Sequence, residues 1–359
     1  MGSYRPFAVW IGGRWEQGLE VEFAEGRMVG HRATSQAPDP MWLSPAFVNA
    51  HSHLEYRGWQ GQLEGLKYWD WLRELTLRKA QETDDTVREW CRVAARENLT
   101  AGVGLIVEHS DRPFSGEALR EVGIEARVLQ ELITFDEAPE TAGKWQAVEE
   151  RRAGQGAEAI TPHATWSVDR DSLSRFRDQD FVSIHVAESV FEAEFFESHR
   201  GPIADFYRRR GKALPRQQPI LDLLDEVGLL REGVQLVHIG GLKVSEYERL
   251  AELGVMIAHC PRSNMNLGCP LPDVRRLLDL GVPVGLGLDS AASSGPIDML
   301  AEIRAMRTRE VGEEEAWRIA TDASAVGMAG ASLPWMVLIS PAQTLEELIS
   351  GQPKIQLNP

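Results

Sequence analysis

Short apolar runs that end in a histidine or an aspartate recur along this chain, and this pattern constrains its fold most. The run from Leu43 to Ala50 leads into His51-Ser52-His53, and later runs end at His185, His238 and Asp289. Because successive side chains of a strand alternate between its faces, His51 and His53 are expected to point the same way. Imidazole and carboxylate groups that gather at strand ends are typical of a metal site.

Eight such runs predict eight strands. They span residues 43–50, 104–107, 126–132, 157–161, 181–184, 234–237, 255–258 and 282–288. Helical patterns lie between them, for example at residues 85–102, 244–254 and 273–281. Strands that alternate with helices form parallel βα units, so the pattern predicts an α/β protein with a TIM-like (β/α)8 barrel over residues 43–325. An open doubly wound sheet is the alternative.

The two ends of the chain have a different pattern. Residues 7–32 alternate apolar and polar positions between turn glycines, which predicts antiparallel strands, and Trp335 to Ile339 predicts another. We expect residues 1–42 and 326–359 to pair in a small β-subdomain beside the barrel. Two unrelated edge decorations are the alternative.

Charge and composition exclude several classes of function. The net charge of −16 repels phosphate backbones and anionic membranes, so neither nucleic acid nor a membrane is an expected partner. No apolar run approaches the roughly 18 residues that span a bilayer, and the N-terminus lacks a signal pattern, so we expect a cytoplasmic protein. Its three dispersed cysteines fit a reducing compartment.

Six motifs together resemble a known family. They are NAHSHLE at His51, TPHATWS at His163, HVAES at His185, VHIGG at His238, AHCPRSN at His259 and GLGLDSAASSG at Asp289. In order and strand placement they are similar to the deaminase branch of the amidohydrolase superfamily. The resemblance implies one divalent metal ion, Zn²⁺ with Fe²⁺ as the alternative, held by His51, His53, His185 and Asp289.

The resemblance also implies the catalytic groups. Glu188 would shuttle a proton to the ring nitrogen of the substrate, His238 would orient or help deprotonate the attacking water, and Asp289 would accept the proton of that water. Read without the resemblance, Glu188 is an ordinary acid at the start of a helix and Asp289 is a helix N-cap.

Four residues are expected to contact the substrate: Glu55, His163, Arg262 and Asn264. Arg262 and Asn264 follow the seventh strand, where a polar side chain can equally shape a turn. Among the other histidines, His109 lines the site or is structural, and His259 supports the pocket from behind. His31 and His199 are expected to be structural.

Binuclear members of the superfamily carry a lysine on the fourth strand, and residues 157–163 contain none, so one ion is expected. Within the branch, the chain most resembles the 6-aminodeoxyfutalosine deaminases. The motifs that carry this resemblance are NAHSHLE, HCPRSN, ASSG and, at Trp69, WDWLR. The alternative for Trp69, Trp71 and Leu72 is that they pack a helix against its neighbours. The resemblance implies hydrolytic deamination of a small purine-like substrate, an adenine-like base or nucleoside, with 6-aminodeoxyfutalosine of menaquinone biosynthesis foremost.

Two other functions remain open. One is another amidohydrolase reaction: guanine, cytosine or adenosine/adenosylhomocysteine-type deamination, or removal of chloride from a ring. The other is a non-catalytic ligand-binding barrel. The sequence does not determine the oligomeric state, for which a homodimer is one option.

Overall fold

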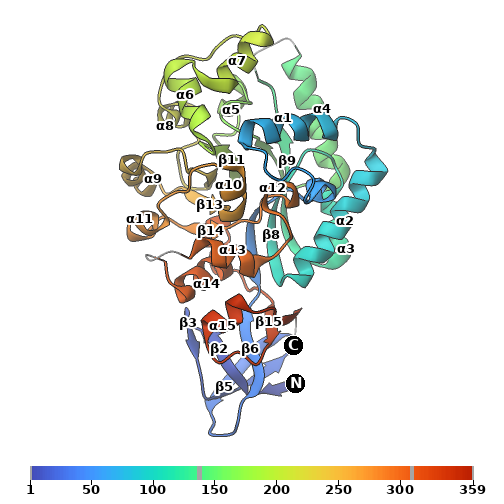
Figure 1. The fold of residues 1–359 in the computed structure, drawn as a ribbon, viewed down its shortest axis with the longest axis vertical. Coiled ribbons are helices and arrows are strands. Elements are labelled where there is room, and N and C mark those ends of the chain that lie inside the picture. The colour runs from blue at the N-terminus through green and yellow to red at the C-terminus, as the bar shows by residue number, and fades with distance from the viewer. Residues whose placement is uncertain (1, 136–139, 308–310, 358–359) are drawn as a thin grey trace.

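Eight parallel strands in chain order form the centre of the molecule (Figure 1). The structure is a computed structural model that describes residues 2–135, 140–307 and 311–357. Its sheets have the orders β10-β9-β8-β7 and β11-β12-β13-β14. The strands are β7 (Phe47–Ser52), β8 (Val103–Ser110), β9 (Glu125–Leu132), β10 (Ala159–Pro162), β11 (Val182–Val186), β12 (Val234–His238), β13 (Met256–His259) and β14 (Val284–Leu286).

Two isolated bridges join these four-stranded sheets at their carboxyl ends. Ser52 pairs with Asp289 at one seam, and Ala164 pairs with His185 at the other. The expected α/β fold with eight parallel strands is therefore confirmed, while its regular hydrogen-bonded ladders fall into two halves.

Helices connect the strands and cover their outer faces. They are α2 (Asp84–Thr100), α3 (Ser115–Val122), α4 (Thr141–Gln155), α5 (Arg170–Ser174), α6 (Val190–Ser198), α7 (Gly201–Arg209), α8 (Ile220–Glu226), η2 (Val244–Glu246), α9 (Tyr247–Glu252), α10 (Pro261–Leu267), α11 (Val274–Asp279), α12 (Ala291–Ser294), α13 (Met299–Met306), α14 (Glu313–Thr321) and η3 (Ser324–Val326). Two more elements, η1 (Leu54–Trp59) and α1 (Tyr68–Lys79), follow β7. In the part of the chain that the structure describes, every helix is too short or too polar to cross a membrane.

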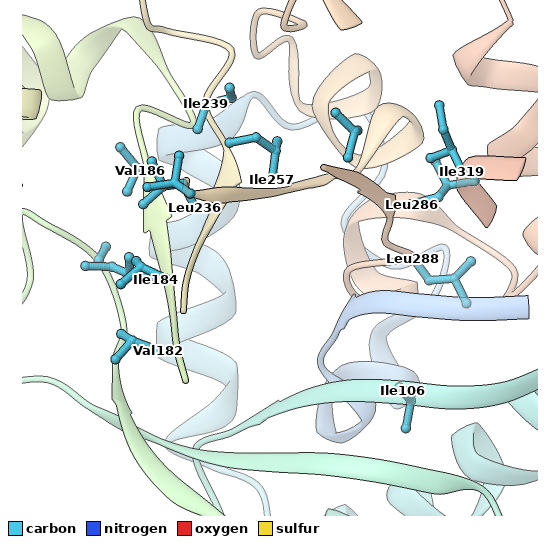
Figure 2. Close-up of a cluster of buried hydrophobic side chains, with 14 of the residues drawn as sticks. Ile106, Val182, Ile184, Val186, Leu236, Ile239, Ile257, Leu286, Leu288 and Ile319 are labelled. Carbon is cyan, nitrogen blue, oxygen red and sulfur yellow. The ribbon is translucent and has the colours of Figure 1, made fainter. Parts of the chain in front are cut away.

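The core has two layers because strand residues alternate between faces. Leu236 and Ile257 pack with helix side chains in the larger cluster, part of which Figure 2 shows. Their neighbours Val237 and Ala258 belong to a second cluster on the opposite strand faces. Both clusters are almost fully buried, so the strand ends that carry the polar residues are held by packing on both sides.

Strands from both chain ends share a sheet at one end of the molecule, beside both termini (Figure 1). This five-stranded sheet has the order β16-β15-β6-β2-β3, and a three-stranded sheet has the order β1-β4-β5. The elements are β1 (Gly2–Tyr4), β2 (Pro6–Ile11), β3 (Arg14–Glu16), β4 (Leu19–Ala24), β5 (Arg27–Ala33), β6 (Asp39–Pro45), β15 (Trp335–Ile339), α15 (Leu345–Ser350) and β16 (Lys354–Leu357).

The single strand expected over residues 43–50 was wrong. The chain leaves β6 at Pro45, and β7 begins at Phe47 in the other sheet. Proline has no backbone N–H for a ladder, and the next amide, that of Ala46, donates to the Pro334 carbonyl at 2.7 Å. The subdomain limit expected after residue 42 falls inside β6.

Candidate metal centre and active site

The seam between β7 and β14 brings three polar side chains together. The amide of Asp289 donates to the His51 carbonyl at 2.9 Å, and the amide of His53 donates to the Asp289 carbonyl at 3.1 Å. His51 Nε2 and His53 Nε2 lie 3.8 and 3.9 Å from Asp289 Oδ1. Asp289 has a φ of +53°, a strained conformation for a residue other than glycine and one that is typical of functional sites.

Hydrogen bonds define the tautomers of two histidines at this site. His53 Nδ1 lies 3.1 Å from the His109 carbonyl, and His185 Nδ1 lies 2.6 Å from the His163 carbonyl. A carbonyl oxygen only accepts, so both Nδ1 atoms carry the proton and both Nε2 atoms are bare. These two Nε2 atoms lie 3.4 Å apart, and two bare nitrogens cannot hydrogen bond to each other.

The donor set therefore fits a cation. Both ring nitrogens of His51 are buried and lack a hydrogen-bond partner, which is rare for buried polar atoms. Nitrogens of His51, His53 and His185 lie within 4.8 Å of one another. Burial lowers the pKa of His51 and His53 well below 6.5 and that of His185 to about 3, which favours the neutral imidazole that binds metal.

Two serine hydroxyls hold the other oxygen of Asp289. Ser263 donates to Oδ2 at 2.5 Å, and Ser293 donates to the same atom at 3.1 Å. Oδ1 is the oxygen that faces His51 and His53. Sequence reasoning missed these contacts, because Ser263 lies 26 residues from Asp289 and resembles a turn residue.

Glu188, His238 and Asp289 form a second group whose ligand-type atoms lie within 4.8 Å of one another. Glu188 Oε1 is 3.8 Å from His238 Nε2. Burial raises the pKa of Glu188 to about 7, while His238 and a hydrogen bond with Tyr68 act in the opposite direction. A carboxyl group with this pKa can both give and take a proton near neutrality. Tyr68, on α1, is a neighbour of Glu188 that sequence reasoning missed.

Asn264 does not take the position expected of a substrate contact. Its side chain is buried, and Oδ1 lies 2.9 Å from His238 Nδ1 while Nδ2 donates to the Pro270 carbonyl at 2.8 Å. Both polar atoms are therefore used within the protein.

Arg262 is also engaged within the protein. Its guanidinium donates to the carbonyls of Pro296 at 2.9 Å and Ser294 at 2.5 Å, and it lies 3.4 Å from the buried carboxyl group of Glu302. These contacts fix the loop after α12 against α10. They give no support to the predicted contact of Arg262 with a substrate.

Glu55 faces the loop after β8. Its two carboxylate oxygens accept from the amides of Asp111 at 2.8 Å and Arg112 at 2.9 Å, and its side chain is buried. The expected substrate contact therefore lacks support here as well. The carboxylate instead holds this loop against the segment that follows His53.

His163, like Arg262, is a predicted substrate contact that is partly open to solvent. A hydrogen bond of 2.7 Å joins its Nδ1 to the Ser167 hydroxyl, and its ring centroid lies 5.0 Å from that of His185. His163 is therefore placed beside the candidate metal ligands with its ring oriented.

His109 lies beside the candidate metal ligands, and both of its ring nitrogens form hydrogen bonds with buried side chains. Gln235 Nε2 donates to the Ala325 carbonyl, so its Oε1 accepts from the Ser183 hydroxyl at 2.6 Å. Ser183 Oγ then accepts from His109 Nε2 at 2.9 Å, and one proton is shared between His109 Nδ1 and Glu131 Oε1, 3.2 Å apart. With both nitrogens engaged and its ring buried, His109 fits the structural alternative.

The remaining histidines, His259, His199 and His31, differ in burial and in hydrogen bonding. His259 is buried with Nδ1 unpartnered, and burial lowers its pKa to about 3. His199 ends α6 with a φ of +51° and forms a hydrogen bond of 2.8 Å with the Pro215 carbonyl, as a structural residue would. His31 is exposed on β5.

Trp71 is buried, and its indole N–H donates to the Ala292 carbonyl at 3.1 Å, so it connects α1 to α12.

A family model described as "Amidohydrolase family" matches residues 42–325 of the chain. The chain belongs to the amidohydrolase family. This match covers the eight parallel strands and every residue placed at the site above. The family expected from the six motifs is confirmed.

Several curated proteins are about 30% identical to this amidohydrolase. 5-Methylthioadenosine/S-adenosylhomocysteine deaminase 2 of Archaeoglobus fulgidus is 30% identical over 281 residues, which are 73% of this chain and 62% of that protein. The 5-methylthioadenosine/S-adenosylhomocysteine deaminase of Natronomonas pharaonis is 31% identical over 77% of this chain and 64% of that protein. A 5'-deoxyadenosine deaminase of Methanopyrus kandleri is 30% identical, with 73% and 60% covered. The chain therefore spans less than two thirds of the length of these relatives.

Solved structures share the fold. Aminofutalosine deaminase of Helicobacter pylori, in complex with methylthio-coformycin, has a TM-score of 0.82 at 19% identity over 99% of this chain and 98% of that chain. An adenosine deaminase from Xanthomonas campestris with bound zinc has a TM-score of 0.79 at 20% identity over 99% and 91%.

Proposed function

We propose that this amidohydrolase is a metal-dependent hydrolytic deaminase of an adenine-like nucleoside. The observation that carries the proposal is the donor set of bare imidazole nitrogens from His51, His53 and His185 beside Asp289 Oδ1. Glu188 and His238 lie at the edge of the same set, so proton-transfer groups adjoin the candidate metal ligands. The similarity to the 5-methylthioadenosine/S-adenosylhomocysteine and 5'-deoxyadenosine deaminases supports an adenine-bearing substrate.

His51, His53, His185 and Asp289 would hold one divalent ion, for which we propose Zn²⁺ with Fe²⁺ as the alternative. Such an ion, when bound, lowers the pKa of a coordinated water to near 7. No lysine lies on β10, in agreement with a single ion.

The protein's own groups would move the protons of the reaction. Water adds to the amino-bearing ring carbon, and its proton passes to Asp289, with His238 orienting the water. Glu188, whose pKa is about 7, gives its proton to the adjacent ring nitrogen. As the new hydroxyl group becomes the carbonyl, its proton passes through Glu188 to the leaving amine, which departs as ammonia. The proton held by Asp289 then restores the acid form of Glu188. His163, partly exposed beside His185, is the proposed substrate contact.

The proposed substrate is an adenine nucleoside modified at its 5' position. We put forward 6-aminodeoxyfutalosine first, on the motifs NAHSHLE, HCPRSN and ASSG. 5-Methylthioadenosine, S-adenosylhomocysteine and 5'-deoxyadenosine are the candidates that the relatives support.

Ammonia release from a substrate panel tests the proposal. The zinc-loaded protein is assayed for ammonia release with these four compounds and with adenosine, guanine and cytosine, and for chloride release with atrazine. Release from one or more adenine nucleosides is expected. Turnover of guanine, cytosine or atrazine alone would overturn the proposed substrate class, and a metal-loaded protein with no turnover would favour a ligand-binding barrel.

A further inference from the structure

The first turn of α10 lies against the histidine that ends β12. His238 has a φ of +72° and the next residue, Ile239, a φ of +50°, so the chain turns sharply as it leaves the strand. Asn264 reaches this turn from α10 and lies between His238 and the segment that ends at Pro270. Asn264 and His238 are both almost completely buried.

The orientation of the Asn264 amide follows from its second partner. The Pro270 carbonyl can only accept, so the atom that faces it at 2.8 Å is the donor Nδ2. The atom 2.9 Å from His238 Nδ1 is then the acceptor Oδ1. An acceptor at this distance requires that Nδ1 carries the proton, and neutral His238 is left with a bare Nε2 on the side of Glu188.

Close packing prevents Asn264 from leaving this position. A Cβ atom at Gly240, two residues after His238, would lie 1.9 Å from the Pro270 carbonyl oxygen, so the two segments touch through their backbones. The amide of Cys269 also donates to the Asn264 carbonyl at 2.8 Å. The turn after β12 and residues 264–270 therefore form one packed unit.

We propose that Asn264 is a positioning residue that sets the Nδ1–H tautomer of His238 and so keeps Nε2 available as an acceptor within the site. In the other tautomer, Nε2 would carry a proton and could not accept one from water. The effect on turnover rests on the proposed deaminase function, whereas the tautomer itself can be measured without any substrate.

Nuclear magnetic resonance tests the proposal on the full-length, zinc-loaded protein labelled with ¹⁵N-histidine. Long-range ¹H–¹⁵N spectra distinguish protonated from bare ring nitrogens, and loss of signals in His238→Gln assigns the ring. The wild type should show a protonated Nδ1 and a bare Nε2. A wild-type His238 with its proton on Nε2 would overturn the proposal, even if every Asn264 variant failed to fold.

Three variants separate positioning from packing. Asn264→Leu keeps the approximate volume but removes the acceptor, so Nε2–H should gain population and kcat should fall at least about 10-fold, with KM changed by less than about 3-fold. Asn264→Asp retains an acceptor and should restore the Nδ1–H pattern. Asn266→Leu, on the same helix, is the matched control and should leave the His238 signals unchanged. An unchanged tautomer in Asn264→Leu would overturn the proposal, whatever the panel of substrates shows.

Discussion

Replacement of Glu55 tests whether this residue contacts the substrate or holds the loop after β8. Its two oxygens accept from the amides of Asp111 and Arg112 at 2.8 and 2.9 Å. Glu55→Ala leaves both amides without their partner. Glu55→Gln keeps one acceptor and places an NH₂ group against the other amide.

The expected cost follows from the number of donors left without a partner. Each buried donor that loses its acceptor costs about 1–3 kcal/mol. Asp111 and Arg112 are only half-buried, so the lower part of this range applies. Glu55→Ala should therefore have a free energy of unfolding about 1–2 kcal/mol lower than that of Glu55→Gln.

Urea unfolding at pH 8 measures these changes. Burial and, after it, the Asp111 carboxylate raise the pKa of Glu55 to about 7, and Glu55 is ionised at pH 8 because this pH lies above that value. Both variants remove the buried charge alike, so the comparison between them isolates the hydrogen bonds to the two amides. Glu97→Ala is the control, since Glu97 pairs with Arg57 at 2.7 Å but both side chains are about one third exposed. Loss of this pair should cost no more than about 1 kcal/mol. Equal stability of Glu55→Ala and Glu55→Gln, with a raised KM in both, would refute the reasoning and favour substrate contact.

Three further predictions concern the metal centre and a buried carboxyl group. Glu188→Gln should keep its metal content and lose at least about 100-fold in turnover, measured by metal analysis and ammonia release; near wild-type turnover would contradict the shuttle role. Asp289→Ala should lower both metal occupancy and rate, so an unchanged metal content counts against Asp289 as a ligand. Burial raises the pKa of Glu302 from 4.5 to about 8, so the folded chain holds a proton that the unfolded chain releases, and stability should fall as pH rises from about 5 to 8. Glu302→Gln should remove up to roughly 5 kcal/mol of that fall in urea unfolding, and an identical pH slope in the variant would show that Glu302 ionises normally.

The sequence predicted which residues gather at the site because strand ends place them there. A polar residue that closes an apolar run marks the carboxyl end of a strand, and parallel strands bring such ends together. His51, His53, His185 and Asp289 follow this rule, and the structure places them side by side.

Hydrogen-bond partners were harder to predict because they depend on the paths of loops. Glu55 closely follows His53 in sequence, and Arg262 and Asn264 follow the strand that ends at His259, but their side chains bind backbone groups or a neighbouring histidine. The partner of His109, Glu131, could have been found from the sequence, because it is a charged residue near the carboxyl end of a predicted apolar strand. The division of residues 43–50 between two sheets was missed because both parts are apolar, and their different partners, β15 for β6 and β8 for β7, lie far away in sequence.

Anomalous X-ray diffraction from crystals of the zinc-loaded protein tests the central claim most directly. We predict one ion, about 2.0–2.2 Å from a ring nitrogen of each of His51, His53 and His185 and from an oxygen of Asp289. A crystal that holds no ion among these four side chains, or one that holds the ion elsewhere in the chain, would contradict the account.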